Sequence, residues 1–304
     1  MDWIGLTTGF LTATFSAGAF LSSAWALKST KGATAPGMLM NAGVVMGAIA
    51  ALMLAVLWKD GIIACVCRHP LVLAGTSVFF ALGQAFVFAA QRQIEASRVV
   101  PLLGFKLPML ALISALLFKE HVGIFQWLAL TLTFLAAFIL NNAGSSFSVS
   151  GIAFVLLGCL SYCVSDLSLT AMTNFLGSEL NESNMLSALH CTALSYVLVG
   201  LIAAFGLCVQ RKKFTMQALR NSVPFAVMWV TCIVFLTLTF ARLGTVHGTI
   251  LQNMRGILTI LFTPICIWFG CTAIESKLTA SLFWRRMVAA LMVLASVFLY
   301  NLGK

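Results

Sequence analysis

The segment Ser97–Asn141 reads SRVVPLLGFKLPMLALISALLFKEHVGIFQWLALTLTFLAAFILN. It contains two long apolar runs, at 97–118 and 122–141, separated by a short polar turn that includes Glu120. Each run has about the twenty residues that a helix needs to cross the hydrocarbon core of a bilayer. Only helices and closed barrels satisfy their backbone hydrogen bonds in lipid, and barrel strands are shorter and alternate in polarity. The segment therefore predicts two membrane-spanning helices.

The same composition extends over the whole chain. Of its 304 residues, 61% are hydrophobic and 9% are charged, whereas about a quarter of the residues in soluble domains are charged. A soluble protein of this length has too small an interior to bury so much apolar surface. The sequence predicts an all-α membrane protein with about ten transmembrane helices. The expected spans are 3–27, 38–58, 71–91, 97–118, 122–141, 149–173, 184–208, 222–242, 246–270 and 279–301.

The formal charge of +10 lies mainly in the short turns between these spans. Lys and Arg in such turns contact lipid headgroups and set the orientation of the protein. Eleven fall on one side of the predicted spans and five on the other, which places both termini outside the cytoplasm. No basic stretch is long enough to form a nucleic-acid-binding face, so we expect no nucleic acid as a partner. The first span lacks a basic n-region and a cleavage site, so we expect it to be permanent.

A second segment, 247–301, has the same organisation as Ser97–Asn141. Each opens with a span that carries proline and one basic residue near its middle, Lys106 or Arg255. Each continues through a polar turn with a glutamate and ends in another apolar span.

The second copy begins five spans after the first. An odd offset gives the two copies opposite directions in the membrane, which is the inverted-repeat plan of many secondary transporters. We therefore predict two inverted five-helix repeats, residues 1–145 and 146–304.

Particular residues strengthen this comparison. The first segment has Val100-Pro101 and Pro108, then the turn LLFKEH at 116–121, then Gln126-Trp127. In the second half, Phe262-Thr263-Pro264 and Glu275 occupy similar places.

Together with the ten spans, these features resemble the drug/metabolite transporter superfamily, of the EamA-like kind. The family commonly has glycine before the glutamate of the turn, where this chain has Lys119. The resemblance implies alternating access around a central cavity lined by spans from both halves. It also implies cytoplasmic termini, opposite to the orientation that the charges indicate.

Three charged residues, Lys106, Asp166 and Arg255, lie deepest in the predicted spans. A charge at such a depth costs roughly 2.5–3.5 kcal/mol on insertion scales, so it usually faces a cavity or a partner. Inverted symmetry would bring Lys106 and Arg255 to the same cavity, where Asp166 supplies one negative charge. The positive charge that remains favours a carboxylate or phosphate on an anionic or zwitterionic substrate.

These charges also permit other roles. Asp166 is expected either to couple transport to proton binding or to serve as the structural partner of a cation. Lys106 and Arg255 would, in the structural alternative, only hold helices together. Lys106 lies two residues before Pro108, which predicts a bent helix beside the cation.

Four uncharged residues within spans are candidate substrate ligands. Gln84, Gln252 and Asn253 are expected to orient hydroxyl or amide groups of the substrate, or to hydrogen-bond neighbouring helices. Tyr162 is expected to line the cavity or to lie at the headgroups.

The histidines and cysteines give weaker indications. His190 and His247 lie near span ends, where packing is the expected role. Cys65, Cys67 and His69 form a C-x-C-x-H cluster that falls short of the four ligands of a structural zinc site, so we expect no metal there.

The chain has no G-x-x-x-x-G-K-[ST] nucleotide-binding loop. We therefore predict a secondary-active transporter of a small organic metabolite, which has neither catalytic residues nor a cofactor. Transport is expected to be downhill, exchange-driven or ion-coupled, with a proton or a counter-substrate as the candidate coupling partner. The expected location is a bacterial inner membrane, with an organellar membrane as the alternative. Three other functions remain open: an intramembrane lipid- or phosphate-processing enzyme that uses Asp166 or His190 as a base, an exporter of amphiphilic or cationic compounds with a site around Asp166, and a scaffold or receptor.

Overall fold

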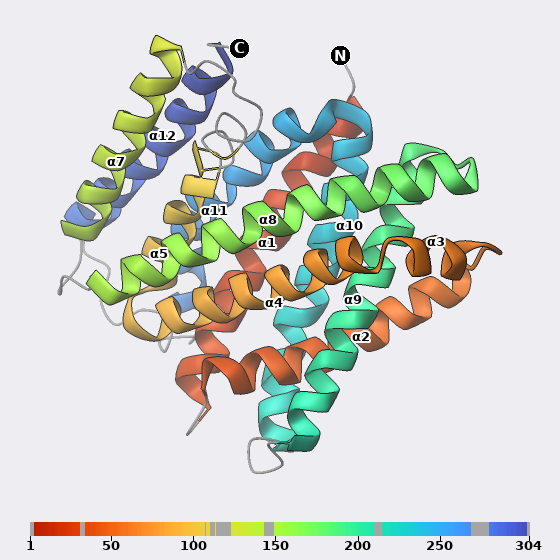
Figure 1. Ribbon diagram of the computed structural model, residues 1–304. Helices are drawn as coiled ribbons and strands as arrows, with labels where there is room; N and C mark the ends of the chain where they lie inside the picture. The colour runs from red at the N-terminus through yellow and green to blue at the C-terminus, as the bar shows by residue number, and fades with distance from the viewer. Residues whose placement is uncertain are drawn as a thin grey trace.

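The computed structural model describes residues 3–30, 34–106, 108–109, 113, 123–142, 149–209, 215–268 and 280–302. Within these ranges every regular element is a helix (Figure 1). The helices are α1 (Trp3–Ser29), α2 (Ala35–Val56), α3 (Ile62–Arg68), α4 (Pro70–Gln93), α5 (Ala96–Leu102), η1 (Leu103–Phe105), α7 (Ile124–Asn142), α8 (Val149–Leu180), α9 (Asn184–Val209), α10 (Met216–Asn253), α11 (Arg255–Trp268) and α12 (Ala280–Leu302).

Six helices in the described part of the chain are long and apolar enough to cross a membrane. They are Trp3–Ser29, Ala35–Val56, Pro70–Gln93, Val149–Leu180, Asn184–Val209 and Met216–Phe240. They coincide with six of the ten expected spans. The all-helical class is therefore confirmed for the described residues, and the six helices are compatible with a multi-pass membrane protein.

The other four expected spans also correspond to helical elements, although these are not among the six. The span 97–118 is described mainly as far as Lys106, where it consists of α5 and η1. The spans 122–141 and 279–301 correspond to α7 and α12, and the span 246–270 corresponds to the end of α10 followed by α11. The predicted turn residues Lys119, Glu120 and Glu275 lie outside the described residues.

α10 is not a straight rod. A Cβ atom added to Gly248 would lie 2.5 Å from Phe240 Cδ1 and 3.2 Å from Thr239 Cγ2. In a straight helix, a separation of eight residues corresponds to a rise of about 12 Å. The helix therefore turns back between Phe240 and Gly248, close to the predicted boundary between two spans.

The long helices pack in pairs that are distant in sequence. α1 lies along α10, α2 along α9, α4 along α8, and α7 along α12, while α5 packs against α11. Figure 1 shows α4 and α8 side by side, and α7 beside α12. Each of these pairs joins a helix from residues 1–145 to one from residues 146–304.

Glycines allow the closest of these approaches. A Cβ atom on Gly47 of α2 would lie 2.5 Å from the Cα of Gly200 on α9, and a Cβ atom on Gly200 would lie 2.6 Å from the Cα of Gly47. No side chain fits between the two backbones there. Small residues have this role in membrane helix pairs, because apolar side chains gain nothing by leaving lipid and association depends on close packing.

Candidate functional site

Each of the two deepest cations follows a break in a helix. α5 ends at Leu102 and continues as the 3₁₀ turn η1, and Lys106 comes directly after that turn. Arg255 follows the turn at Met254 that separates α10 from α11. Proline lacks a backbone N–H and disturbs the helical ladder, and Pro101 lies inside α5. The described break therefore precedes Pro108, the residue from which a bend was predicted.

The two broken segments lie against each other. A Cβ atom on Gly256 of α11 would lie 3.0 Å from the Cα of Pro101 on α5. Because Gly256 adjoins Arg255, this crossing places one broken helix directly on the other. Discontinuous helices whose ends face a common site are a feature of transporter binding sites.

Lys106 and Asp166 form an ion pair. The Lys106 Nζ atom contacts the Asp166 Oδ2 atom, and the side chains are 7% and 23% exposed, respectively. Cys163, one turn before Asp166 on α8, donates its thiol hydrogen to the Lys106 carbonyl oxygen over 3.3 Å. The fold thus brings together two of the three predicted deep charges, and the carboxylate is the more accessible partner.

Arg255 has a different environment. Its residue is 3% exposed, and the guanidinium carbon lies 5.5 Å from the centre of the Phe20 ring. Among the described residues it forms no ion pair, and its Nε atom has no hydrogen-bond partner. Arginine over an aromatic face gains a cation–π interaction, but that interaction does not neutralise the charge.

Gln84 and Tyr162 are joined by a hydrogen bond. The Tyr162 hydroxyl donates to the Gln84 Oε1 atom over 2.6 Å, and both side chains are buried. A Cβ atom on Gly83 would lie 2.7 Å from the Tyr162 ring, so the glycine allows this close contact. Tyr162 and Asp166 are four residues apart on α8 and therefore share one helix face.

Four predicted substrate ligands each have a buried polar atom without a hydrogen-bond partner. These atoms are Gln84 Nε2, Gln252 Oε1, Asn253 Nδ2 and Arg255 Nε. Buried polar groups in native proteins are nearly always satisfied by protein or by ordered water. The missing hydrogen bond of each atom is expected if these groups bind water or a polar ligand.

An aromatic cluster, which sequence analysis did not identify, lies beside Arg255. The Phe20 ring meets Trp229 edge-on at 5.4 Å between centroids, and Phe80 lies 5.0 Å from Tyr196 and 5.8 Å from Trp229. The Trp229 indole N–H donates to the Tyr196 hydroxyl oxygen over 2.7 Å. Aromatic residues occur in most apolar spans, so nothing in the sequence distinguishes those that meet at one point.

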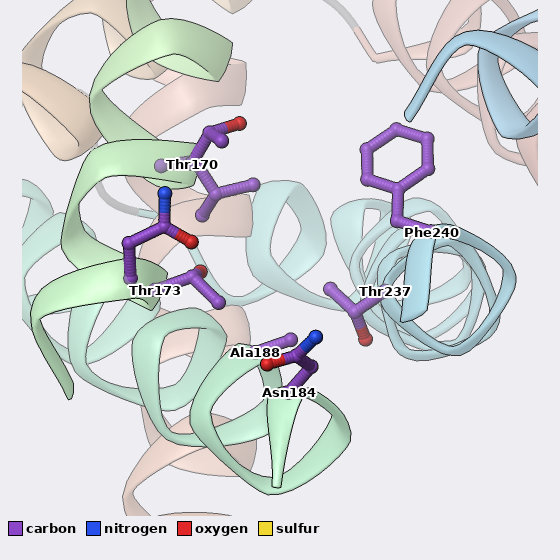
Figure 2. Close-up of a pocket in the computed structure, with 8 residues that line it drawn as sticks. Thr170, Thr173, Asn184, Ala188, Thr237 and Phe240 are labelled. Carbon is purple, nitrogen blue, oxygen red and sulfur yellow. The ribbon is translucent and has the colours of Figure 1, made fainter. Parts of the chain in front are cut away.

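A polar pocket also escaped sequence analysis. It has a volume of about 170 Å³ and lies between α8, α9 and α10 (Figure 2). Figure 2 shows Thr170 and Thr173 on one side of it, and Thr237 and Phe240 on the other. The lining residues are Leu169, Thr170, Thr173, Asn174, Asn184, Ala188, Thr237 and Phe240. The Thr170 hydroxyl donates to the Asp166 carbonyl oxygen over 3.0 Å, so the pocket lies one helical turn from the ion pair.

His190 lies in a separate charged cluster at the α8–α9 end of the molecule. Its Nδ1 atom is 2.8 Å from Glu182 Oε2, and its Nε2 atom is 2.5 Å from the Leu57 carbonyl oxygen. Lys59 Nζ lies 3.2 Å from the same glutamate. Both ring nitrogens of His190 are thus engaged. The side chain of His247 lies outside the described residues.

Within the C-x-C-x-H cluster, Cys65 is buried and Cys67 is exposed, so the two thiols have different surroundings. His69 stacks on Phe175 with 3.8 Å between ring centroids, and its Nε2 atom lies 2.9 Å from Glu179 Oε1. Burial raises the pKa of the Cys65 thiol to about 11, so this thiol is protonated at neutral pH. Within the described part of the chain, no three His, Cys, Asp or Glu side chains are grouped as metal ligands would be.

Comparison with known proteins gives a likeness of fold alone. No family model matches the chain, and no curated protein matches it. One protein crystal structure is similar over 98% of this chain and 96% of its own length, with a TM-score of 0.58 and 13% sequence identity. The architecture is therefore one that another solved protein shares over its whole length.

Proposed function

We propose that the chain is a secondary-active transporter of a small organic anion or zwitterion, in which Arg255 binds the anionic group beside the Lys106–Asp166 pair. The observation that carries this proposal is the environment of Arg255, a buried guanidinium without a carboxylate partner among the described residues. Removing the partner of a buried charge typically costs several kcal/mol. A purely structural arginine would be expected to have such a partner, whereas a binding residue acquires one with its ligand.

The other predicted substrate ligands agree with this assignment. Gln84, Gln252 and Asn253 each have a buried polar atom without a partner. Ligand sites commonly combine apolar walls with a few such groups that orient the ligand. In the proposed site the aromatic cluster would form the walls, and the amides would supply donors and acceptors.

The packing of the helices supports two inverted repeats. If the two halves are repeats, each predicted span corresponds to the span five positions later. Replacing every helix by its counterpart turns the pair α1–α10 into α8–α4. It leaves the pairs α2–α9, α5–α11 and α7–α12 unchanged, and all five pairs occur in the structure. This is the pattern that a two-fold axis between residues 1–145 and 146–304 would produce. It favours ten spans and a resemblance to the drug/metabolite transporter superfamily.

Asp166 is our candidate for the coupling residue. Its carboxylate is partly exposed although it is paired with Lys106. Protonation of Asp166 would break the pair and release the ammonium group, so a proton and an anionic substrate would have linked effects on the same site. We propose a cell membrane, such as a bacterial inner membrane, as the location.

The test is the thermal stabilisation of the purified protein by inorganic phosphate, small carboxylates, amino acids and organic cations. A ligand that binds only the folded state raises the midpoint of unfolding. We expect an anionic or zwitterionic compound to stabilise the protein, and R255Q to lose this response. The matched control is R285Q, because Arg285 is an exposed arginine on α12. Retention of the full response in R255Q, or stabilisation by cations only, would reject the proposal.

A second candidate function is export of amphiphilic compounds. An apolar pocket of about 360 Å³ lies between α1, α10 and α11 and is lined by Gly18, Leu21, Ser22, Trp25, Met228, Phe262, Ile265 and Cys266. Its size and composition suit an amphiphile that enters from the lipid. Stabilisation by tetraphenylphosphonium that is lost in W25A, and not in R255Q, would favour this function.

A further inference from the structure

The polar pocket between α8, α9 and α10 lies at the ends of the expected spans 149–173, 184–208 and 222–242. Thr170, Asn174 and Asn184 are exposed there. Elsewhere along α8 the exposed side chains include Leu157, Leu160 and Leu167, as expected of a surface in contact with acyl chains. Asn174 directly follows the expected span 149–173, and Asn184 begins the expected span 184–208, so both amides lie near the membrane surface. Exposed amides deeper in hydrocarbon would lack hydrogen-bond partners, which costs several kcal/mol for each group. This part of the surface therefore faces water.

The pocket continues as a polar stripe toward the ion pair. Asp166, Thr170 and Thr173 follow the spacing i, i+4 and i+7, which places them on one face of α8. Tyr162 lies one turn further along the same face, where it meets Gln84. Because Asp166 is also the more accessible member of its ion pair, the stripe leads from the pocket to the proposed anion site.

The lining indicates what the pocket can bind. Five polar side chains line it, and none of its lining residues carries a charge. The Thr170 and Thr237 hydroxyls donate to backbone carbonyl oxygens, so their oxygens remain available as acceptors. The amides of Asn174 and Asn184 can donate and accept, and the Phe240 ring offers a flat apolar face. Such a set matches a ring that carries hydroxyl groups on its edges and C–H groups on its faces.

The volume of the pocket agrees with the size of one such ring. Pockets for drug-sized molecules span roughly 300–1,000 Å³, so a pocket of about 170 Å³ suits a single ring. We propose that this pocket is the outer subsite of the transport pathway, and that it binds a neutral, hydroxyl-bearing ring of the substrate before the anionic group reaches Arg255. The inference rests on the proposed function for the role of Arg255, but the pocket can be tested separately.

The test is labelling of T173C by a membrane-impermeant maleimide in intact membranes. The parent chain carries C67S, C208S and C271S, which removes two exposed cysteines and one outside the described residues. The matched control is L160C, because Leu160 is exposed on α8 and does not line the pocket. We expect T173C to be labelled and L160C to resist. Equal resistance of both variants would mean that the pocket faces lipid and would overturn the proposal.

Protection from labelling identifies the bound group. We expect glucose and glucose 6-phosphate to slow labelling of T173C several-fold, and inorganic phosphate to leave the rate unchanged. The proposed subsite would be overturned if neither sugar slowed the labelling of T173C, or if phosphate slowed it equally. Adding R255Q to T173C separates the two proposals. Protection by glucose should survive R255Q, whereas an unchanged thermal response of R255Q to anions would reject the role of Arg255 without affecting the pocket.

Discussion

The ammonium group of Lys106 and the carboxylate of Asp166 pair across the contact between the end of η1 and α8. Lys106 is 7% exposed and Asp166 is 23% exposed, so the carboxylate is the more accessible partner. The interaction links a residue of 1–145 to one of 146–304. A change in the protonation of Asp166 therefore acts on the interface between the two proposed repeats.

Substitution D166N should destabilise the protein by about 3 kcal/mol, because it leaves the Lys106 ammonium buried without its counter-charge. The double variant K106M/D166N should recover most of this loss, since both charges are then absent. The measurement is thermal unfolding in detergent for the two single variants and the double variant. Additive losses would show that the pair contributes no coupling energy.

Substitution F20L should destabilise the protein by removing the cation–π interaction between Phe20 and Arg255. It removes the aromatic face 5.5 Å from the guanidinium, and a desolvated cation–π pair contributes about 2 kcal/mol. Part of the loss will come from packing, so the cycle with R255Q isolates the interaction. The control is F10L on the same helix, because Phe10 is exposed. If the effect of F20L is the same with and without Arg255, the interaction is absent.

Substitution G47A should destabilise the contact between α2 and α9 by about 1–3 kcal/mol, the usual cost of overpacking. The added methyl group would meet the backbone of Gly200 at 2.5 Å, and a backbone atom cannot move aside like the end of a side chain. The control is G206A on the same pair of helices, where the nearest atom is the flexible end of Met40 at 3.0 Å. Equal stability of both variants would contradict the close crossing.

Substitution H190A should destabilise the end of the bundle by about 2 kcal/mol, because the buried Glu182 carboxylate loses a partner. H69A should have a smaller effect, since His69 and Glu179 are both partly exposed and exposed ion pairs contribute little. Thermal unfolding in detergent compares the two variants. A larger effect of H69A would reverse the ranking of the two clusters.

The cysteines of α3 should react in a fixed order. The thiolate is the reactive form, and burial raises the pKa of Cys65 to about 11. This thiol should therefore remain protonated and resist maleimide from pH 7 to 9, while the exposed Cys67 is modified. Mass spectrometry of peptides after labelling at several pH values measures both sites. Comparable rates at pH 7 would show that Cys65 is more accessible than the structure indicates.

Sequence analysis identified the helical class and the deep charges because lipid imposes both signals. About twenty apolar residues are needed to cross the bilayer. A charge within them costs enough free energy to indicate a functional or structural role. Lys106, Asp166 and Arg255 were found in this way. That Lys106 pairs with Asp166 depends on the packing of η1 against α8, which no spacing along the chain encodes.

Other features depend on the meeting of distant segments. Gly47 resembles every other glycine in an apolar run until Gly200 is brought against it. The residues that line the polar pocket come from three helices. A threonine in a span normally hydrogen-bonds its own backbone, so its presence alone does not indicate a site. The turn within α10 was indicated by a boundary near residue 244, but the continuous helical conformation through it was not.

The contact between Gly47 and Gly200 also bears on movement. Two backbones that touch without intervening side chains have nothing to repack when the angle between them changes, unlike interdigitated surfaces, which resist rotation. The crossing joins one proposed repeat to the other, and it involves one of the three helix pairs that repeat exchange leaves unchanged. We therefore expect it to act as a fulcrum, a fixed point about which the two halves rock while the openings on either side of the membrane widen and narrow in turn.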